Sequence, residues 1–410
     1  MNHPSMDRKT AIAIIESLRS GIPTRLSTRE LPDLRPNLTA KIIRDLEQFA
    51  AGNYPKGRLI WGAYGQGKTH ELTCIEHLAL DRGFAVSKVT LSRELSGQHL
   101  FRLYGKIASS IRTPDSKLFG IQHKLNQKQI SDLPDSPIQD LERYSHPLPA
   151  IILENYFYAQ AEEPDLLYGD LLGSRIPIAE IKRIHRVRRG ILFPKIPTFG
   201  ALKHGQAYFE VMSDIIQWCG YKGWVILIDE IELMARLGKL GRLNAYKNLN
   251  WLLNWSQDQS FPFYCVGGVA SPLMDLWLGS GRRLPDQEEI PKLAMQKFCD
   301  DEVETLEFFF KEALNDQQCP IISPLERSQL QKTLEMLVQI HGISYAWEAT
   351  INLDELINSI GASPLRTYIR ALLESLDVKF LYSVDLKPTI INISGLDIDK
   401  GDFFQEGGNE

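Results

Sequence analysis

The sequence has few of the features that mark secreted or membrane proteins. Its five cysteines form no CxxC pair and show no spacing against histidine that suggests a zinc site. No stretch approaches the roughly 18 consecutive apolar residues that a membrane span needs. The N-terminus also has no long apolar segment of the kind found in signal peptides. These absences argue against a disulfide scaffold and a membrane protein, so we expect free thiols and a cytoplasmic location.

The chain also has no excess of positive charge. Its 410 residues include 46 lysines and arginines against 51 aspartates and glutamates, a net charge of -5. A global basic field for nucleic acid is therefore absent, and any such contact would have to come from a local patch. The length suggests two or three domains, and the 43% hydrophobic composition is ample for a core.

The stretch GAYGQGKT follows the short apolar run RLIW and leads into a helical pattern, KTHELTCIEHLALDRG. It fills the pattern GxxxxGK[ST], in which glycines let backbone N–H groups turn toward phosphate oxygens. A helix that begins near Lys68 would point its positive end at the anion. We expect Lys68 to neutralise the β- and γ-phosphates during catalysis and Thr69 to bind Mg²⁺. The predicted nucleotide-binding residues are Gly62, Ala63, Tyr64, Gly65, Gln66, Gly67, Lys68, Thr69 and His70.

A second motif, VILIDEIE, is an apolar run that ends in carboxylates, as a buried strand of a parallel sheet does. P-loop enzymes need an acid at the end of a neighbouring strand to hold Mg²⁺, and Asp229 suits that role. Glu230 suits the catalytic base that polarises the attacking water. A base at this position is typical of ATPases that hydrolyse autonomously. We assign Glu232 to the N-terminal turn of a helix.

The order of these patterns predicts an α/β fold, a P-loop NTPase with a parallel sheet flanked by helices and a helical C-terminal subdomain. About 160 residues separate Thr69 from Asp229, far more than adjacent βα units need. We therefore expect a large insertion at about 93–199. The predicted division is an N-terminal helical segment at 1–56, the ATPase core at 57–291, a helical lid at 292–382, and a short hairpin with an acidic tail at 383–410.

Part of the expected insertion is strongly basic. Residues 176–205 hold seven lysines and arginines and one acid. On a helix Lys182, Arg186 and Arg189 would share a face, with Arg183 beside them. Such a face can grip a phosphate backbone. It can equally dock an acidic protein or be plain solvated surface, and the sequence leaves these three interpretations open.

Three further places are candidates for sensing or completing a nucleotide site. Ser271 follows the apolar run FPFYCVGGVA, where additional-strand ATPases keep a polar sensor of the γ-phosphate; a turn-forming serine is the alternative. Arg366, at the start of a C-terminal helix, would contact phosphate if that helix closes over the nucleotide, and is otherwise a surface arginine. Arg282 and Arg283 are candidates for an arginine finger. A finger of this kind acts across a subunit boundary and so implies a homo-oligomer.

Six blocks of the chain resemble the ATP-binding proteins of BREX systems, the BrxD-like P-loop family of bacterial anti-phage islands. They are ESLRSGIPTR, GAYGQGKTHEL, VSKVTLSRE, LFRLYGKIASSI, GYKGWVILIDEIEL and SPLRTYIRALLESLD. The blocks are scattered over most of the chain and leave 113–195 unmatched. The resemblance implies an AAA+-like ATPase that uses ATP and Mg²⁺ and acts on DNA. It also implies other defence proteins as partners, among them a DNA methyltransferase and often a helicase-like protein.

The motifs and the resemblance together predict an ATPase that couples ATP turnover to remodelling or assembly of protein–DNA complexes in phage defence. Two other functions remain open. One is a nucleotide-dependent interaction module that assembles partners with little hydrolysis. The other is an initiator-like AAA+ protein of the origin-recognition type. Such a protein should end in a winged helix, for which KFLYSVDLKPTIINIS offers at most a β-hairpin.

Overall fold

The computed structural model describes residues 6–20, 24–132, 141–255, 261–279, 284–297 and 300–386. Within them the chain forms a five-stranded sheet in the order β1-β5-β4-β2-β3. Neighbouring strands are parallel, except that the short edge strand β3 is antiparallel to β2. This architecture confirms the expected α/β fold. The strands are β1 (Arg58–Gly62), β2 (Ala85–Thr90), β3 (Ile111–Arg112), β4 (Trp224–Asp229) and β5 (Phe263–Ala270).

Strand β5 lies between β1, which leads into the glycine loop, and β4, which ends at Asp229. One strand therefore separates the two strands that lead to the predicted phosphate-binding and Mg²⁺-binding residues. A further segment continues the sheet beyond β1. The Trp61 N–H donates to the Pro320 carbonyl (3.0 Å), and the Ile322 N–H donates to the Trp61 carbonyl (2.6 Å). The chain that leaves the sheet after β5 therefore returns to it at the β1 edge before entering α15, α16 and α17.

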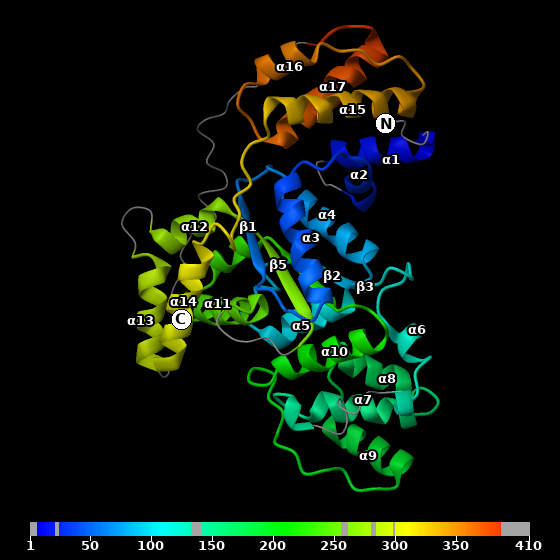
Figure 1. The fold of residues 1–410 in the computed structure, drawn as a ribbon, viewed down its shortest axis with the longest axis vertical. Helices are drawn as coiled ribbons and strands as arrows, with labels where there is room; N and C mark the ends of the chain where they lie inside the picture. Colours follow the sequence, from blue (N-terminus) through cyan, green and yellow to red (C-terminus); the bar gives the residue numbers. More distant parts are fainter. Residues whose placement is uncertain are drawn as a thin grey trace.

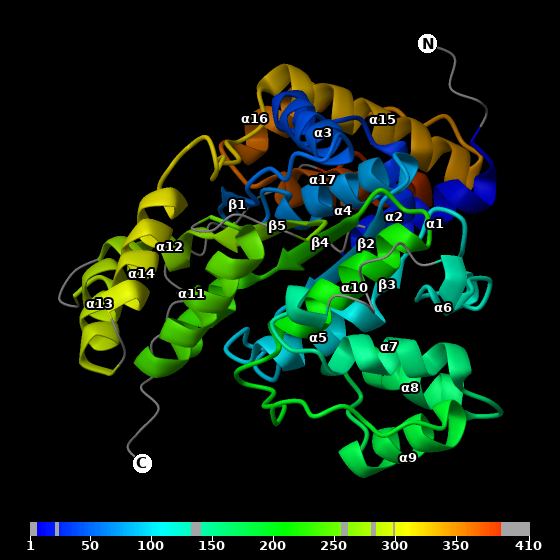
Figure 2. The ribbon, with the colours of Figure 1, turned by 60° about the horizontal axis from the view of Figure 1, so that its bottom comes forward.

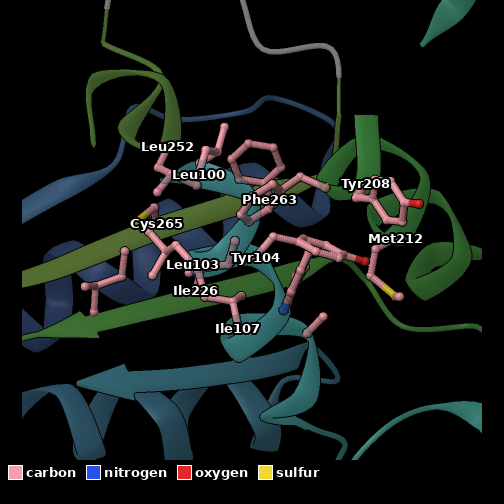
Figure 3. Packing of buried hydrophobic residues seen from close by; sticks show 14 of the residues in the cluster. Leu100, Leu103, Tyr104, Ile107, Tyr208, Met212, Ile226, Leu252, Phe263 and Cys265 are labelled. Atoms are coloured by element: carbon pink, nitrogen blue, oxygen red, sulfur yellow. The ribbon is translucent and has the colours of Figure 1, made fainter. Parts of the chain in front are cut away.

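Helices cover both faces of the sheet (Figure 1). Because successive side chains of a strand alternate, Ile60 of β1 packs in the cluster of α3 and α4, while Leu59 and Trp61 pack in the cluster on the other face. Figure 3 shows part of this second layer, where Leu103 and Tyr104 of α5 are among the buried side chains. The helices of the two layers are α3 (Pro36–Ala50) and α4 (Lys68–Asp81), then α5 (Leu100–Ser109), α10 (Gln206–Trp218) and α11 (Lys239–Leu253).

Helices α7, α8 and α9 lie on the far side of α5 and α10 from the sheet in both ribbon views (Figures 1 and 2). Their apolar residues continue the cluster that covers the sheet instead of forming a separate core. The region is therefore anchored to the sheet through α5 and α10. The helices from this part of the chain are α6 (Gln122–Leu125), α7 (Leu148–Tyr158), α8 (Glu163–Leu171) and α9 (Ile178–Arg189).

A second apolar cluster joins the two ends of the described chain, at the top of Figure 1. Ile14 and Ile15 of α1 are buried there with Leu334 and Leu337 of α15. By contrast, Phe309 of α14 belongs to the cluster over the sheet. The division into domains stays a prediction. The remaining helices are α1 (Arg8–Arg19), α2 (Arg25–Glu30), α12 (Ser271–Leu278), α13 (Asp286–Lys297), α14 (Asp300–Ala313), α15 (Arg327–Tyr345), α16 (Leu353–Ile360) and α17 (Leu365–Tyr382).

Two further expectations concern membrane-spanning helices and the C-terminal end of the chain. Among the residues with described placement, none of the helices is both long and apolar enough to cross a bilayer. Helix α17 continues to Tyr382, so residues 379–382, considered as the start of a hairpin wing, are helical. The rest of the expected hairpin and acidic tail, from 387 onward, lies outside the described residues.

Candidate nucleotide-binding site

The glycine loop connects β1 to α4 at the edge of the sheet where the parallel strands end. Gly65 and Gly67 have φ angles of +78° and +97°, which L side chains rarely adopt, so the turn depends on glycine at both positions. The Gln66 side chain accepts a hydrogen bond from the Ala63 N–H (2.8 Å) within the loop. Helix α4 begins at Lys68, directly after Gly67. The unpaired N–H groups of its first turn therefore lie at the loop, as the phosphate-binding pattern predicts.

The Lys68 ammonium is held against this loop. Lys68 is 8% exposed, and its Nζ donates to the carbonyl oxygens of Gly62 (2.9 Å) and Ala63 (3.1 Å). Burial lowers the pKa of Lys68, and the nearby acids, Glu232 first among them, act in the opposite direction. Its bonded partners are neutral carbonyls, so a buried positive charge is left without an ion pair within the part of the chain that the structure describes. An anion entering the loop would supply that pair.

Strand β4 brings Asp229 to the same edge of the sheet. The Thr69 hydroxyl donates to Asp229 Oδ2 (2.7 Å), although 160 residues separate the two. The Glu230 N–H donates to Asp229 Oδ1 (3.0 Å), and Asp229 is 3% exposed. On β5, Gly268 leaves room for this carboxylate, because a Cβ there would lie 3.0 Å from Oδ1. A hydroxyl and a carboxylate in direct contact are hard oxygen ligands, so the residues present fit Mg²⁺.

Glu230 follows Asp229 in a backbone conformation that is costly for its residue type. Its φ of 60° and ψ of 37° lie in the left-handed region, which costs a non-glycine residue about 1–3 kcal/mol. Burial raises the pKa of Glu230 and the charge of Asp229 adds to the rise, whereas Lys68 and Arg366 oppose it. A half-buried carboxylate of raised pKa is a better proton acceptor than an exposed one. Backbone strain and a raised pKa together are typical of active-site residues.

The sequence did not reveal the tertiary contact of Glu232. As expected, Glu232 lies in the first turn of a helix, the 3₁₀-helix η3 (Ile231–Arg236). Its side chain is fully buried, however, and Oε2 accepts a hydrogen bond from the N–H of Ala270 at the end of β5 (2.9 Å). Burial raises the pKa of Glu232 to about 7. Glu232 thus links the segment after the acidic strand to the end of the next strand. The feature of the sequence that could have indicated this burial is an acidic residue flanked by apolar residues, two positions after Glu230.

The C-terminal helix α17 begins beside the glycine loop. Leu365 and Arg366 line a cavity of about 180 Å³ together with Gly65, Lys68 and Glu230. The Arg366 N–H lies 3.5 Å from the Gly65 carbonyl oxygen. The structure therefore brings Arg366 from the far end of the chain to the predicted site, where a lid arginine can reach a bound nucleotide.

The structure says less about the other sensor candidate and about the candidates for an arginine finger. Ser271 is exposed at the first residue of α12, directly after β5. Ala270 pairs with Gly62, so Ser271 follows the strand end that adjoins the glycine loop. Its sensor role stays a prediction. Arg282 and Arg283 lie outside the described residues.

The N-terminal helices complete the cavity, a contribution that the sequence did not indicate. Leu18 of α1 and Leu31 and Leu34, which follow α2, line it together with Ile369 of α17. Apolar walls beside a phosphate loop suit the base and sugar of a nucleotide. His70 also lines the cavity, and its burial lowers its pKa to about 4, which keeps the imidazole neutral at pH 7.

Comparison with known proteins identifies the family. The family described as BREX system ATP-binding protein BrxC/D matches residues 6–135 and 200–279, together just over half of the chain. The chain belongs to this family. The matched segments include the glycine loop, Asp229 and Glu230, whereas the unmatched residues between them include α7, α8 and α9.

Other comparisons add little to this assignment for the BREX protein. None of the curated proteins matches it. Among solved structures, the Orc1 protein of Aeropyrum pernix in complex with DNA aligns over 85% of this chain at 14% identity, with a TM-score of 0.32. The alignment spans 60% of that chain. A similarity this low supports no inference about function.

The basic helix α9 of this BREX protein is more neutral than its sequence suggests. Arg189 forms an ion pair with Glu154 of α7. Arg183 lies 2.7 Å from Glu180 and 3.5 Å from Glu163 of α8. Counting charges along 176–205 missed Glu154 and Glu163 because they belong to other helices. The two other predicted contact residues, Lys182 and Arg186, are exposed. Nucleic-acid contact at α9 stays a prediction.

Proposed function

We propose that this BREX protein hydrolyses ATP and uses the cycle of binding and hydrolysis to remodel or assemble protein–DNA complexes. The observation that supports hydrolysis best is the contact between Thr69 and Asp229 at 2.7 Å, with Glu230 directly following. That contact brings the two side chains together beside the glycine loop, which supports their proposed role as Mg²⁺ ligands. The predicted base is the next residue along the chain.

The phosphates of ATP would lie in the glycine loop. The N–H groups at the start of α4 and the Lys68 ammonium would bind them, with Lys68 exchanging its carbonyl partners for phosphate oxygens. Thr69 and Asp229 would hold Mg²⁺, which when bound neutralises charge on the phosphates. The apolar wall of Leu31 and Leu34 would face the base and sugar.

Glu230 would accept a proton from the attacking water, a role that its raised pKa supports. Arg366 would stabilise negative charge on the phosphates from the lid side, because it lines the same cavity. Ser271, at the end of β5, would sense whether the γ-phosphate is present. Glu232 would keep that strand end in register with the base through its bond to Ala270.

The target of the ATPase cycle rests on the family. We propose that the protein acts on DNA together with other defence proteins, among them a methyltransferase and a helicase-like protein. The competing proposal is a nucleotide switch that binds ATP, closes α17 over the loop and recruits partners with little hydrolysis. Both share the same nucleotide site, so turnover decides between them.

The test compares ATP turnover and Mg-ATP affinity in the parent and in Glu230→Gln. Removal of a general base should reduce turnover at least ~100-fold and leave affinity within a few-fold. The matched control is Glu374→Gln, an exposed glutamate on α17, which should retain parental turnover. Equal turnover in Glu230→Gln and the parent would refute the assigned base. A parent that binds ATP tightly but does not turn it over, with or without DNA, would favour the switch.

A further inference from the structure

A second cavity opens beside the nucleotide site, at the end of β2. It measures about 940 Å³ and is lined by the end of β2, the loop after it and one side of α5. Its lining includes Lys88, Arg93, His99, Arg102 and Lys106, and the single acid among its described lining residues is Glu94. We call these residues and the space between them the β2–α5 cleft.

The positive charge of the β2–α5 cleft is not compensated within the described part of the chain. Arg93, Arg102 and Lys106 are exposed, and none of them forms an ion pair with a described residue. Arg102 and Lys106 are one helical turn apart on α5, a like-charge spacing that weakly destabilises a helix. On α9, by comparison, Arg183 and Arg189 are both paired with acids. Uncompensated charge of one sign in a cleft attracts ligands of the opposite sign.

The cleft is built on a rigid support. The opposite side of α5 carries Leu103, Tyr104 and Ile107, which are at most 1% exposed and lie in the core shown in Figure 3. With these side chains fixed against the sheet, Arg102 and Lys106 are held on the exposed side of the helix. A ligand would therefore meet a preformed surface.

The cleft is also connected to the nucleotide site. The Leu91 N–H donates to the carbonyl oxygen of Asp229 (3.0 Å). The Lys88 ammonium, at the wall of the cleft, donates to the carbonyl oxygen of Thr69 (3.4 Å) and to the Thr73 hydroxyl. Lys88 therefore connects the wall of the cleft to Thr69, and Leu91, which lies between the lining residues Thr90 and Ser92, connects it to Asp229.

We propose that the β2–α5 cleft binds the phosphodiester backbone of DNA. Anion binding follows from the uncompensated Arg93, Arg102 and Lys106. Phenylalanine, tyrosine and tryptophan side chains, on which unstacked bases are usually held, are absent from the described lining of the cleft, so the contact is to the backbone and independent of sequence. This inference rests on the proposed function and deepens it by naming the surface through which DNA would sense or drive ATP turnover.

The test measures binding of a fluorescein-labelled duplex of arbitrary sequence to the full chain by anisotropy at several salt concentrations. Arg102→Gln/Lys106→Gln should weaken binding by about tenfold or more, because two phosphate contacts are lost. The slope of log K against log salt should become shallower by about 2, since each contact contributes about 0.9. A labelled single strand forms the second arm, and similar losses on both identify the shared backbone chemistry.

The matched control is Lys332→Gln/Arg370→Gln, which removes the same two residue types from exposed positions on α15 and α17. It should bind the duplex within twofold of the parent, with the parental salt slope. Lys182→Gln/Arg186→Gln tests the other predicted contact, on α9, at the same spacing as the pair in the cleft. Equal losses in the cleft variant and the control, loss in the α9 variant without loss in the cleft variant, or a parent that does not bind DNA would each overturn the proposal. Poly-glutamate that binds the cleft more tightly than the duplex at the same salt would point to an acidic protein and overturn it as well.

Failure of the cleft and failure of the proposed ATPase are distinguishable. ATP turnover in Glu230→Gln reports on the ATPase alone, and duplex binding by Arg102→Gln/Lys106→Gln reports on the cleft alone. Full turnover in Glu230→Gln together with lost DNA binding in the cleft variant would refute the base and support the cleft. The reverse pair of results would support the base and refute the cleft. Matching thermal unfolding of each variant and the parent shows that the fold is intact.

Discussion

The glycine loop, through Lys68, and helix α9, through its run of lysines and arginines, both suggest anion binding in the sequence, yet they carry their charge in different ways. In the loop, Lys68 is buried and bonded to neutral carbonyls. On α9, Arg189 is paired with Glu154, and Arg183 with Glu180. A count of basic residues is therefore a weak guide to an anion site. What separates the two regions is whether the fold has already provided the counter-charge.

The largest expected effect comes from removing the uncompensated charge of the loop. Lys68→Ala should lower Mg-ATP affinity or turnover by about a hundredfold or more, since a buried ammonium facing phosphate is among the strongest electrostatic contacts in such a site. Isothermal titration with Mg-ATP and a turnover assay measure both quantities. Lys182→Ala on α9 is the control and should bind ATP like the parent. Similar ATP affinity and turnover in Lys68→Ala and the parent would show that the unpaired charge of Lys68 does not serve nucleotide binding.

The next effect concerns the lid. Arg366→Ala should reduce ATP turnover by about tenfold, because one charge-assisted contact to phosphate is lost. The control is Arg370→Ala, one helical turn further along α17, exposed and not part of the cavity. Steady-state turnover at saturating ATP distinguishes the two variants. If both lose the same activity, Arg366 acts through the lid as a whole and is not a specific phosphate contact.

On α9 the expected effect is on stability and not on the nucleotide. Glu154→Ala removes the partner of the half-buried Arg189, and the free energy of unfolding should fall by about 1–2 kcal/mol, between the values typical of exposed and buried pairs. Chemical denaturation measures this, and ATP affinity should be unchanged. Glu180→Ala, which breaks an exposed pair within the helix, should have no measurable effect. A large loss of ATP affinity in Glu154→Ala would mean that α9 is not a separate structural element.

The smallest effect is a change of pH dependence at Glu71, in the first turn of α4. Burial raises the pKa of Glu71 to about 7 from an ordinary value of 4.5, with Asp33 adding to the rise. Between these two values the folded protein holds a proton that the unfolded chain has lost, so stability falls as pH rises from about 4.5 to about 7.

Glu71→Gln has no such proton to lose, and its unfolding free energy should fall less over this range. Denaturant unfolding at several pH values measures the slope. Some slope should remain, since Glu232 shifts in the same direction. Glu47→Gln, an exposed glutamate on α3, should keep the parental slope. An unchanged slope in Glu71→Gln would show that its carboxylate is ionised in the fold.

Much of the fold could be predicted because its signals are local. The strand RLIW, the glycine loop and the helix from Lys68 follow one another in the chain, and each is specified by its own residues. The apolar runs of β4 and β5 likewise indicate buried strands without reference to the rest of the chain. Glycines at 65 and 67 and the acid at the end of β4 then predict the phosphate and Mg²⁺ positions. The fold class and the family follow from these elements.

The tertiary structure alone decided which polar and charged groups meet. The hydrogen bond from the Ala270 N–H to Glu232, the pairing of Arg189 with Glu154 and the approach of the Arg366 N–H to the Gly65 carbonyl join residues that are far apart in the sequence. No periodicity reports such contacts, because helix and strand patterns record burial and not the identity of a neighbour. The same reason explains why the sequence drew attention to α9. Only packing shows that Arg183, Arg188 and Arg189 of α9 are paired with acids while the basic residues of the β2–α5 cleft are not.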